Sequence, residues 1–230
     1  LKKWSESSNI NIHLMTNFYV AGEEIDCAII LPHNIIVIDL KTGKGSVVGC
    51  ENGEWTCESE KNKFTLNPGR KNPYLQAREK KYGLMNYLKS RIDEIFSPQK
   101  ASQMSFNHTN SYIVFSDKVD WDSTQVDPKI KVWFDVIDIA SIPSKLDTIL
   151  SKKIKEYDDS GNPIYKSLNL SDQEAWLIPT LLNLKSCDSG SKGDLRDGSE
   201  KNLSHGNQNQ PEITSSKEPL KYKEDDKLNQ

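Results

Sequence analysis

Two apolar runs with a turn between them constrain the fold of this chain more than any other feature. Residues 24–31 (EIDCAIIL) and 34–42 (NIIVIDLKT) are rich in β-branched side chains, and Pro32 and His33 separate them. β-Branched residues favour strands, and a proline beside a polar residue is typical of a turn. The two runs therefore predict a β-hairpin.

The turn sets which residues face each other across this hairpin. A two-residue loop at positions 33 and 34, or a four-residue loop around it, would place Asp26 opposite Lys41 and Ala28 opposite Asp39. Because side chains alternate along a strand, Asp26, Asp39 and Lys41 would share one face. The opposite face would be an apolar layer suited to packing against a helix, made of Ile25, Cys27, Ile29, Leu31, Ile36, Ile38 and Leu40.

Ionisable groups on so apolar a hairpin need a cation, a lysine or water as a partner, because an unpaired buried carboxylate is costly. Two neighbouring carboxylates can hold a hard divalent ion such as Mg²⁺ or Mn²⁺, and such an ion can activate water for phosphodiester hydrolysis. Asp26 and Asp39 are therefore candidate metal ligands, and Lys41 would orient the water or stabilise developing negative charge. The alternative from spacing alone is a structural salt bridge between Asp26 and Lys41 on a solvated face.

The remaining elements predict an α/β architecture with a mixed sheet. The glycines between positions 43 and 53 predict a second hairpin, in which Trp55 is expected in the core rather than as a base-stacking platform. Asn72 and Pro73 have the residue types of a helix N-cap and first turn. That helix should run to about Phe96, with a buried stripe of Tyr74, Ala77, Leu84, Leu88, Ile92 and Ile95.

Residues before and after this helix complete the pattern. Residues 1–4 look like the end of a helix and 10–20 like extended segments, while 112–116 and 131–137 read as short strands. Helices are expected over about 142–157 and from Ser171, where SDQE fits a capping box and Pro179 should kink or shorten the helix. Strands followed by a helix, two strands and further helices are typical of a mixed α/β fold.

Composition separates the C-terminal end from the rest. From residue 186 to 230 the only aromatic side chain is Tyr222, and Ser, Gly, Asn, Asp and Lys dominate. Such a stretch cannot bury enough apolar surface to offset the entropy of ordering, so residues 186–230 are expected to be a disordered linker after one folded domain over 1–185. A first residue that is not Met suggests a piece of a longer protein.

Charge and residue usage exclude several function classes. The net charge is −3, so a broadly basic nucleic-acid coat is not expected, although a local basic groove stays open. No apolar run is long enough to span a membrane, and a cytoplasmic location is the expectation. The four cysteines and four histidines show no zinc-ligand spacing, so the thiols are expected to be reduced and incidental.

Five motifs in order resemble the nuclease-related domain known as NERD, a family of the PD-(D/E)xK nuclease superfamily. They are EID, then IDLK with Asp39 thirteen residues after Asp26, then TGKG, GEWT and NPYLQA, and they cover about residues 17–88. The resemblance implies a restriction-endonuclease-like core, with a mixed central sheet flanked by helices. It assigns Asp26 and Asp39 to the metal carboxylates, Lys41 to the lysine and Gln76 to the family's glutamine.

The chain also departs from the family pattern. The second carboxylate is usually Glu in NERD sequences, and Asp39 is one methylene shorter. Related nucleases often add a glutamate from a first core helix, of which this chain retains only the last turn. Glu24 is a weak substitute for that ligand, and its more ordinary role is a solvated strand start.

Basic residues near the NPYLQA motif suggest contacts to a nucleic-acid backbone. Arg70 and Lys71 precede the predicted helix and could bind phosphate beside its positive N-terminal end. Gln76, Lys80 and Tyr87 form a stripe beside the buried face of that helix, which could reach the site or DNA. The alternative for Gln76 and Lys80 is a solvated helix face.

Together these features predict a nuclease domain that uses Mg²⁺ or Mn²⁺ and cleaves DNA, with RNA as an open alternative. By resemblance it would be covalently linked to a helicase or other module in DNA processing or antiphage defence, and homo-oligomerisation stays open. The rival prediction is a noncatalytic module of the same fold that binds nucleic acid or protein. A third is that cleavage needs the full-length protein.

Overall fold

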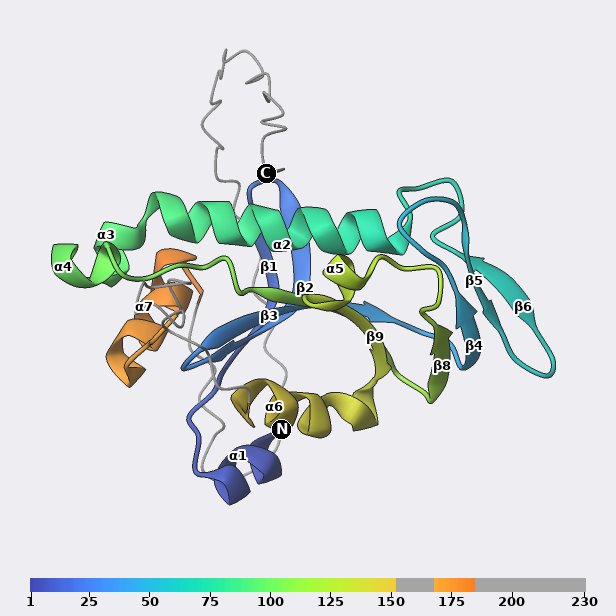
Figure 1. Ribbon diagram of the computed structural model, residues 1–230, viewed down its shortest axis with the longest axis horizontal. Helices are drawn as coiled ribbons and strands as arrows, with labels where there is room; N and C mark the ends of the chain where they lie inside the picture. The colour runs from blue at the N-terminus through green and yellow to red at the C-terminus, as the bar shows by residue number, and fades with distance from the viewer. Residues whose placement is uncertain (152–167, 185–230) are drawn as a thin grey trace, which may run out of the picture. The chain divides into compact units, whose positions relative to one another are not determined.

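The computed structural model describes residues 1–151 and 168–184, all of which belong to one compact unit. The linker expected over residues 186–230 lies outside the described residues. Figure 1 shows a mixed α/β arrangement in which helices lie on both sides of a central sheet. No helix in the described part of the chain is long and apolar enough to cross a membrane.

The central sheet has five strands in the order β1-β2-β3-β7-β9. β1 (His13–Val20), β2 (Glu23–Leu31) and β3 (Asn34–Lys41) are antiparallel, whereas β7 (Asn110–Phe115) and β9 (Phe134–Asp138) follow parallel to β3. The expected mixed sheet is confirmed. Strand β1 forms one edge of this sheet, and the predicted hairpin β2-β3 lies next to it.

The register of the hairpin differs from the prediction by two residues. Leu31 pairs with Asn34, so the turn is Pro32-His33, and Ala28 faces Val37 rather than Asp39. Pro32 therefore lies in the turn instead of in the ladder, as its missing N–H favours. A shift of two residues moves no side chain to the other face, because the alternation along a strand also has period two.

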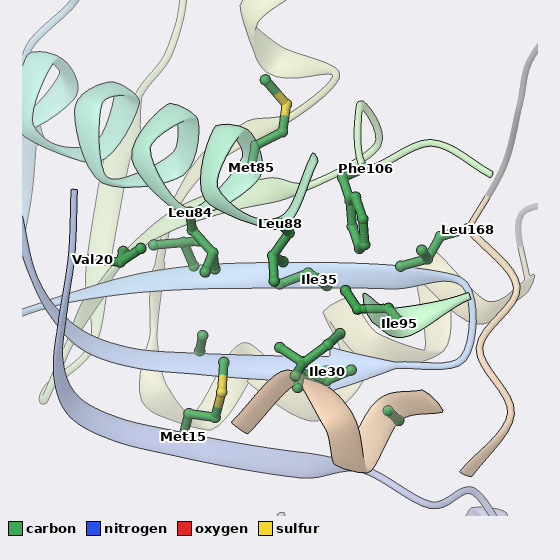
Figure 2. Close-up of a cluster of buried hydrophobic side chains, with 14 of the residues drawn as sticks. Met15, Val20, Ile30, Ile35, Leu84, Met85, Leu88, Ile95, Phe106 and Leu168 are labelled. Atoms are coloured by element: carbon green, nitrogen blue, oxygen red, sulfur yellow. The ribbon is translucent and has the colours of Figure 1, made fainter. Parts of the chain in front are cut away.

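Helix α2 (Pro73–Ser90) covers one face of this sheet, and its packing builds the largest described core cluster. Figure 2 shows Leu84, Met85 and Leu88 of α2 above Ile30 and Ile35 of the hairpin. Beyond these, the cluster takes in Phe106, Leu168 and side chains of β1. The hairpin face that carries the two aspartates is therefore apolar over most of its length.

The opposite face packs against α6 (Ile142–Ser151) and α1 (Lys2–Ser8), around Cys27, Ile29, Leu31, Ile36 and Ile38. Two members of the predicted apolar layer do not belong there. Ile25 is buried in the α2 cluster, and Leu40 is half exposed. The departure of Ile25 coincides with Asn17 on β1, whose left-handed backbone interrupts the β1-β2 pairing opposite Asp26.

Helix α2 begins as the sequence predicts. The Asn72 side chain accepts a hydrogen bond from the backbone N–H of Leu75 at 2.8 Å, and Pro73 occupies the first turn. The predicted end at Phe96 is wrong, because Arg91 leaves helical geometry (φ −122°, ψ 21°) and separates α2 from α3 (Ile92–Ile95) and α4 (Pro98–Ala101). The predicted buried stripe is confirmed, with Ile92 only partly buried.

A second sheet in the order β6-β5-β4-β8 lies beside the first. It contains the predicted hairpin β4 (Gly45–Val48) and β5 (Trp55–Glu58), together with β6 (Lys63–Leu66) and β8 (Val119–Asp122), which the sequence pattern did not indicate. Trp55 is fully buried, with its ring 6.1 Å from Trp121 and 6.2 Å from Phe134. Its predicted core position is confirmed.

The later elements follow the predicted order, although strand β9 begins later than expected. β9 begins at Phe134 rather than at 131, since a short helix α5 (Pro128–Lys131), capped by Asp127, occupies the preceding residues. A 3-10 turn η1 (Ile139–Ser141) precedes α6, and the part of that predicted helix beyond 151 lies outside the described residues. The capping box that opens α7 (Asp172–Leu181) at Ser171 is confirmed, with Pro179 inside the last turn.

Candidate active site

The N-terminal half of α2, the ends of β2 and β3 and the loop before α2 enclose an open cleft of about 400 Å³. Asp26 comes from β2, Asp39 and Lys41 come from β3, and Gln76 and Lys80 come from α2. The predicted site residues are thus brought to one place. The lining comprises Glu23, Glu24, Asp26, Asp39, Leu40, Lys41, Asn67, Arg70, Lys71, Gln76, Glu79 and Lys80.

Asp39 is the most buried charged group of this cleft, with 1% of its surface exposed. Its Oδ1 accepts a hydrogen bond from Lys80, and its Oδ2 lies 2.7 Å from Lys41 Nζ. The contact with Lys41 is an ion pair without hydrogen-bond geometry, so the buried Oδ2 accepts no hydrogen bond within the described part of the chain. Each oxygen of this buried carboxylate therefore faces a lysine ammonium, Oδ1 that of Lys80 and Oδ2 that of Lys41.

Asp26 lies at the mouth of the cleft, with 27% of its side chain exposed. Its Oδ2 accepts a hydrogen bond from the backbone N–H of Leu40 at 2.7 Å, which ties β2 to β3 beyond the last ladder pair. Its Oδ1 lies 3.5 Å from Lys80 Nζ. Because Asp26 and Asp39 contact the same ammonium, the two carboxylates are held close together.

Lys80 contacts both acids from the helix, whereas it was predicted as a contact for the nucleic-acid backbone. Burial alone would lower the pKa of Lys80, but the charge of Asp39, its hydrogen bond and the weaker contact with Asp26 together raise that pKa above its ordinary value. Lys80 is therefore a cation at neutral pH. A signal was present in the sequence, since Lys80 falls between Ala77 and Leu84 at the spacing of the buried stripe.

Gln76 lines the cleft without a hydrogen bond to either aspartate. Its Oε1 accepts a hydrogen bond from Asn67 at 2.8 Å, so the residue is fixed by the loop before α2. Tyr87, predicted in the same stripe, lies elsewhere and donates its hydroxyl hydrogen bond to the carbonyl of Leu181 at 2.8 Å. The stripe therefore reaches the site through Gln76 and Lys80 only.

The rim of the cleft carries both signs of charge. Lys71 Nζ pairs with Glu79 at 2.7 Å, whereas Arg70 is exposed and forms no ion pair with any described residue. Glu23 and Glu24 line the same cleft. The two basic residues predicted to bind phosphate thus differ, because only Arg70 is free of a competing carboxylate.

The donors present fit a hard divalent ion with few protein ligands. Carboxylate oxygens suit Mg²⁺, which binds through one or two carboxylates and completes its shell with water and phosphate oxygens. Asp26 and Asp39 supply two such carboxylates, which lie close enough together to contact the same lysine ammonium. A larger protein cage is not available, since no group of three or more His, Cys, Asp or Glu in the described ranges could hold an ion.

Helix α1 adds no carboxylate to the cleft. Its Trp4 donates a hydrogen bond to Asp147 of α6 at 2.8 Å and packs with the cluster on the opposite face of the sheet. Glu6, the acid of this helix, is exposed. Helix α1 therefore does not supply the glutamate that related nucleases often add from their first core helix.

Comparison with known proteins identifies one relationship. Neither the curated proteins nor the solved structures contain a significant match. The family model described as nuclease-related domain matches residues 1–116, which include every residue that lines the cleft. Because this match covers half of the chain, the protein belongs to the nuclease-related domain family, NERD.

Proposed function

We infer that this domain is a nuclease that hydrolyses phosphodiester bonds of DNA with the help of Mg²⁺ or Mn²⁺. Membership of a nuclease-related family supports the general activity. The observation that carries the specific proposal is the buried Asp39 beside Asp26 in an open cleft, where both carboxylates contact the ammonium of Lys80. A carboxylate pair in that state is suited to a divalent ion and a phosphate.

Asp26 and Asp39 would hold the ion, which when bound polarises a phosphoryl oxygen and lowers the pKa of a water molecule. Lys41, whose ammonium is kept at the cleft by Asp39, would stabilise negative charge that develops on the phosphate. Gln76 has its carbonyl oxygen engaged by Asn67, which leaves its amide N–H groups to orient water or substrate. These roles use only side chains that line the cleft.

The rim supports a nucleic acid as the substrate. Arg70 lies just before α2, where the unpaired N–H groups of a helix N-terminus also favour anions. Glu23, Glu24 and Glu79 oppose this charge, so binding should depend on a small number of phosphate contacts. We further propose a cytoplasmic protein in which a linked helicase or similar module brings DNA to this cleft, in DNA processing or antiphage defence.

One observation favours a second candidate, a noncatalytic module that binds nucleic acid or protein. Two aspartates and two lysines already form a balanced cluster, so the cleft needs no metal to offset its buried charge. Such a module would bind its partner in the presence of a chelator and cleave nothing. Its affinity would not depend on Mg²⁺.

The two candidates separate in a cleavage assay with end-labelled single-stranded DNA, duplex DNA and single-stranded RNA, each with Mg²⁺, Mn²⁺ or a chelator. The test variant is Asp26→Asn, because an amide oxygen can still accept the Leu40 N–H hydrogen bond. The matched control is Asp93→Asn, an exposed acid on α3. Metal-dependent cleavage lost in Asp26→Asn and kept in Asp93→Asn supports the nuclease.

The opposite result also has a defined meaning. A folded domain that binds DNA with the chelator present, and cleaves none of the substrates with either ion, overturns the nuclease proposal for the isolated domain. Repeating the assay with the full-length protein then separates a binding module from a nuclease that requires its linked partner. Preference among the labelled substrates identifies the nucleic acid.

A further inference from the structure

Lys80 has a position in the cleft that a lysine binding only the phosphate backbone of a nucleic acid would not need. It reaches from α2 to the Oδ1 atoms of both Asp26 and Asp39, and among the described residues it is the side chain that touches both acids. Lys41, by contrast, pairs with Asp39 on the other oxygen. Lys80 thus stands at the point where the two carboxylates meet.

The Oδ2 atoms of Asp26 and Asp39 offer a divalent cation no position that both acids share. Asp26 Oδ2 already accepts the Leu40 N–H, and Asp39 Oδ2 faces the ammonium of Lys41. A cation that binds both acids therefore approaches oxygen atoms that Lys80 now contacts. Two cations between the same carboxylates repel each other strongly in a partly buried site.

We propose that Lys80 is a built-in counter-ion that a divalent ion must displace from Asp26 and Asp39, so that this lysine sets the metal affinity of the cleft. The inference rests on the proposed metal-dependent function. A lysine is suited to the role because its flexible four-carbon stem lets the ammonium move while the helix stays in place. The cleft is open, so the displaced head group has solvent or a substrate phosphate to contact.

The competing explanation is that Lys80 only ties α2 to the sheet. A structural tie predicts that removing the lysine weakens the fold and leaves metal affinity unchanged or weaker. Competition predicts the reverse for the metal, since the carboxylates gain an unneutralised charge. Metal affinity therefore distinguishes the two roles, whereas stability alone does not.

The experiment measures Mn²⁺ binding by electron paramagnetic resonance in the wild-type chain, Lys80→Gln and Lys80→Arg. Lys89→Gln, an exposed lysine of the same helix, is the matched control. We expect the dissociation constant for Mn²⁺ to fall roughly tenfold in Lys80→Gln, the scale of an ordinary coupling between two sites. It should stay near the wild-type value in Lys80→Arg, which keeps the charge, and in Lys89→Gln.

A thermal readout keeps the test valid if Lys80→Gln is less stable. Mn²⁺ should raise the thermal midpoint of Lys80→Gln by more than that of the wild-type chain, because tighter binding to the folded state gives greater stabilisation. Equal or weaker Mn²⁺ binding by a folded Lys80→Gln overturns the competition and leaves the proposed metal site intact. No Mn²⁺ binding by any folded variant overturns both.

Discussion

Lys80 on α2 donates a hydrogen bond to Asp39 on β3, across 41 residues of sequence. This contact joins the helix that covers the sheet to the strand that carries the buried acid. Because Lys41 also depends on Asp39 for its ion pair, the carboxylate of Asp39 contacts two ammonium groups. The charge balance of the cleft therefore depends on Asp39 more than on Asp26.

Replacing Asp39 should destabilise the fold far more than replacing Asp26. Asp39→Asn leaves Lys80 partly buried without its main partner, and removing one member of a buried pair costs about 3 kcal/mol. Asp26→Asn should cost less than about 1 kcal/mol, because the side chain is partly exposed and its amide oxygen still accepts from Leu40. Urea denaturation measures both, and equal losses would contradict the assignment of Asp39 as the central acid.

The hairpin illustrates what the sequence could and could not predict. The alternation of residues placed Asp26 and Asp39 on one face, and an even shift in register preserves that placement. The exact pairing was wrong because it depends on which two residues form the turn, and a proline beside a histidine fits several loops. Period-two patterning therefore determined the face of the site but not the opposing pairs.

Lys81 should destabilise the protein at neutral pH. It is 3% exposed, and burial followed by the charge of Lys89 lowers its pKa from 10.5 to about 8. Contacts with the rings of Trp133 at 4.2 Å and Tyr82 at 4.5 Å offset part of that penalty. We therefore expect Lys81→Met to raise the free energy of unfolding by about 1 to 2 kcal/mol at about pH 7.

The pH dependence of stability tests whether burial of the charged Lys81 amine causes this effect. Because the folded pKa of Lys81 is below the unfolded value, wild-type stability rises as the pH increases from about 8 toward 10.5. The advantage of Lys81→Met should be complete below about pH 8 and should shrink as the pH approaches 10.5. Urea denaturation at several pH values measures this difference, and a gain that is independent of pH would contradict burial of a charged amine as its source.

Arg70 should contribute one phosphate contact to DNA binding. With a chelator present to prevent cleavage, Arg70→Gln should weaken binding and reduce the slope of log affinity against log salt by about 0.9, the value for one neutralised phosphate of duplex DNA. Fluorescence anisotropy over a salt series measures the slope. Lys89→Gln, near the other end of α2, should leave it unchanged. An unchanged slope in Arg70→Gln would remove Arg70 from the interface.

Gly49 should be intolerant of any side chain, because it packs against the buried Trp55. A Cβ at this position would lie 2.1 Å from Cδ2 of the Trp55 ring, so Gly49→Ala should cost about 1 to 3 kcal/mol through overpacking. Gly83→Ala on α2 is the matched control. Its Cβ would meet Ala21 at an ordinary 3.6 Å, and alanine in a helix should stabilise by up to about 1 kcal/mol. Thermal unfolding of both variants tests the packing.

Lys80 and the second sheet mark the limits of sequence reasoning in different ways. Charged residues are seldom buried, so Lys80 was placed beside the buried stripe and predicted to contact nucleic acid. β6 and β8 are short strands without a clear alternation, and β8 gains its place by pairing with β4, far away in sequence. Such elements depend on tertiary contacts, whereas the cap of α2 and the capping box of α7 are local and were predicted correctly.

A divalent ion bound to Asp26 and Asp39 is the central feature of the proposed nuclease site, and anomalous diffraction from a crystal soaked in Mn²⁺ detects such an ion directly. We predict one anomalous peak at coordination distance from both carboxylates, with the Lys80 ammonium moved away from them. The Asp26→Asn crystal soaked in the same way should lose the peak. A wild-type crystal with no peak at this cleft, and with Lys80 still between the two acids, would contradict a metal site at Asp26 and Asp39.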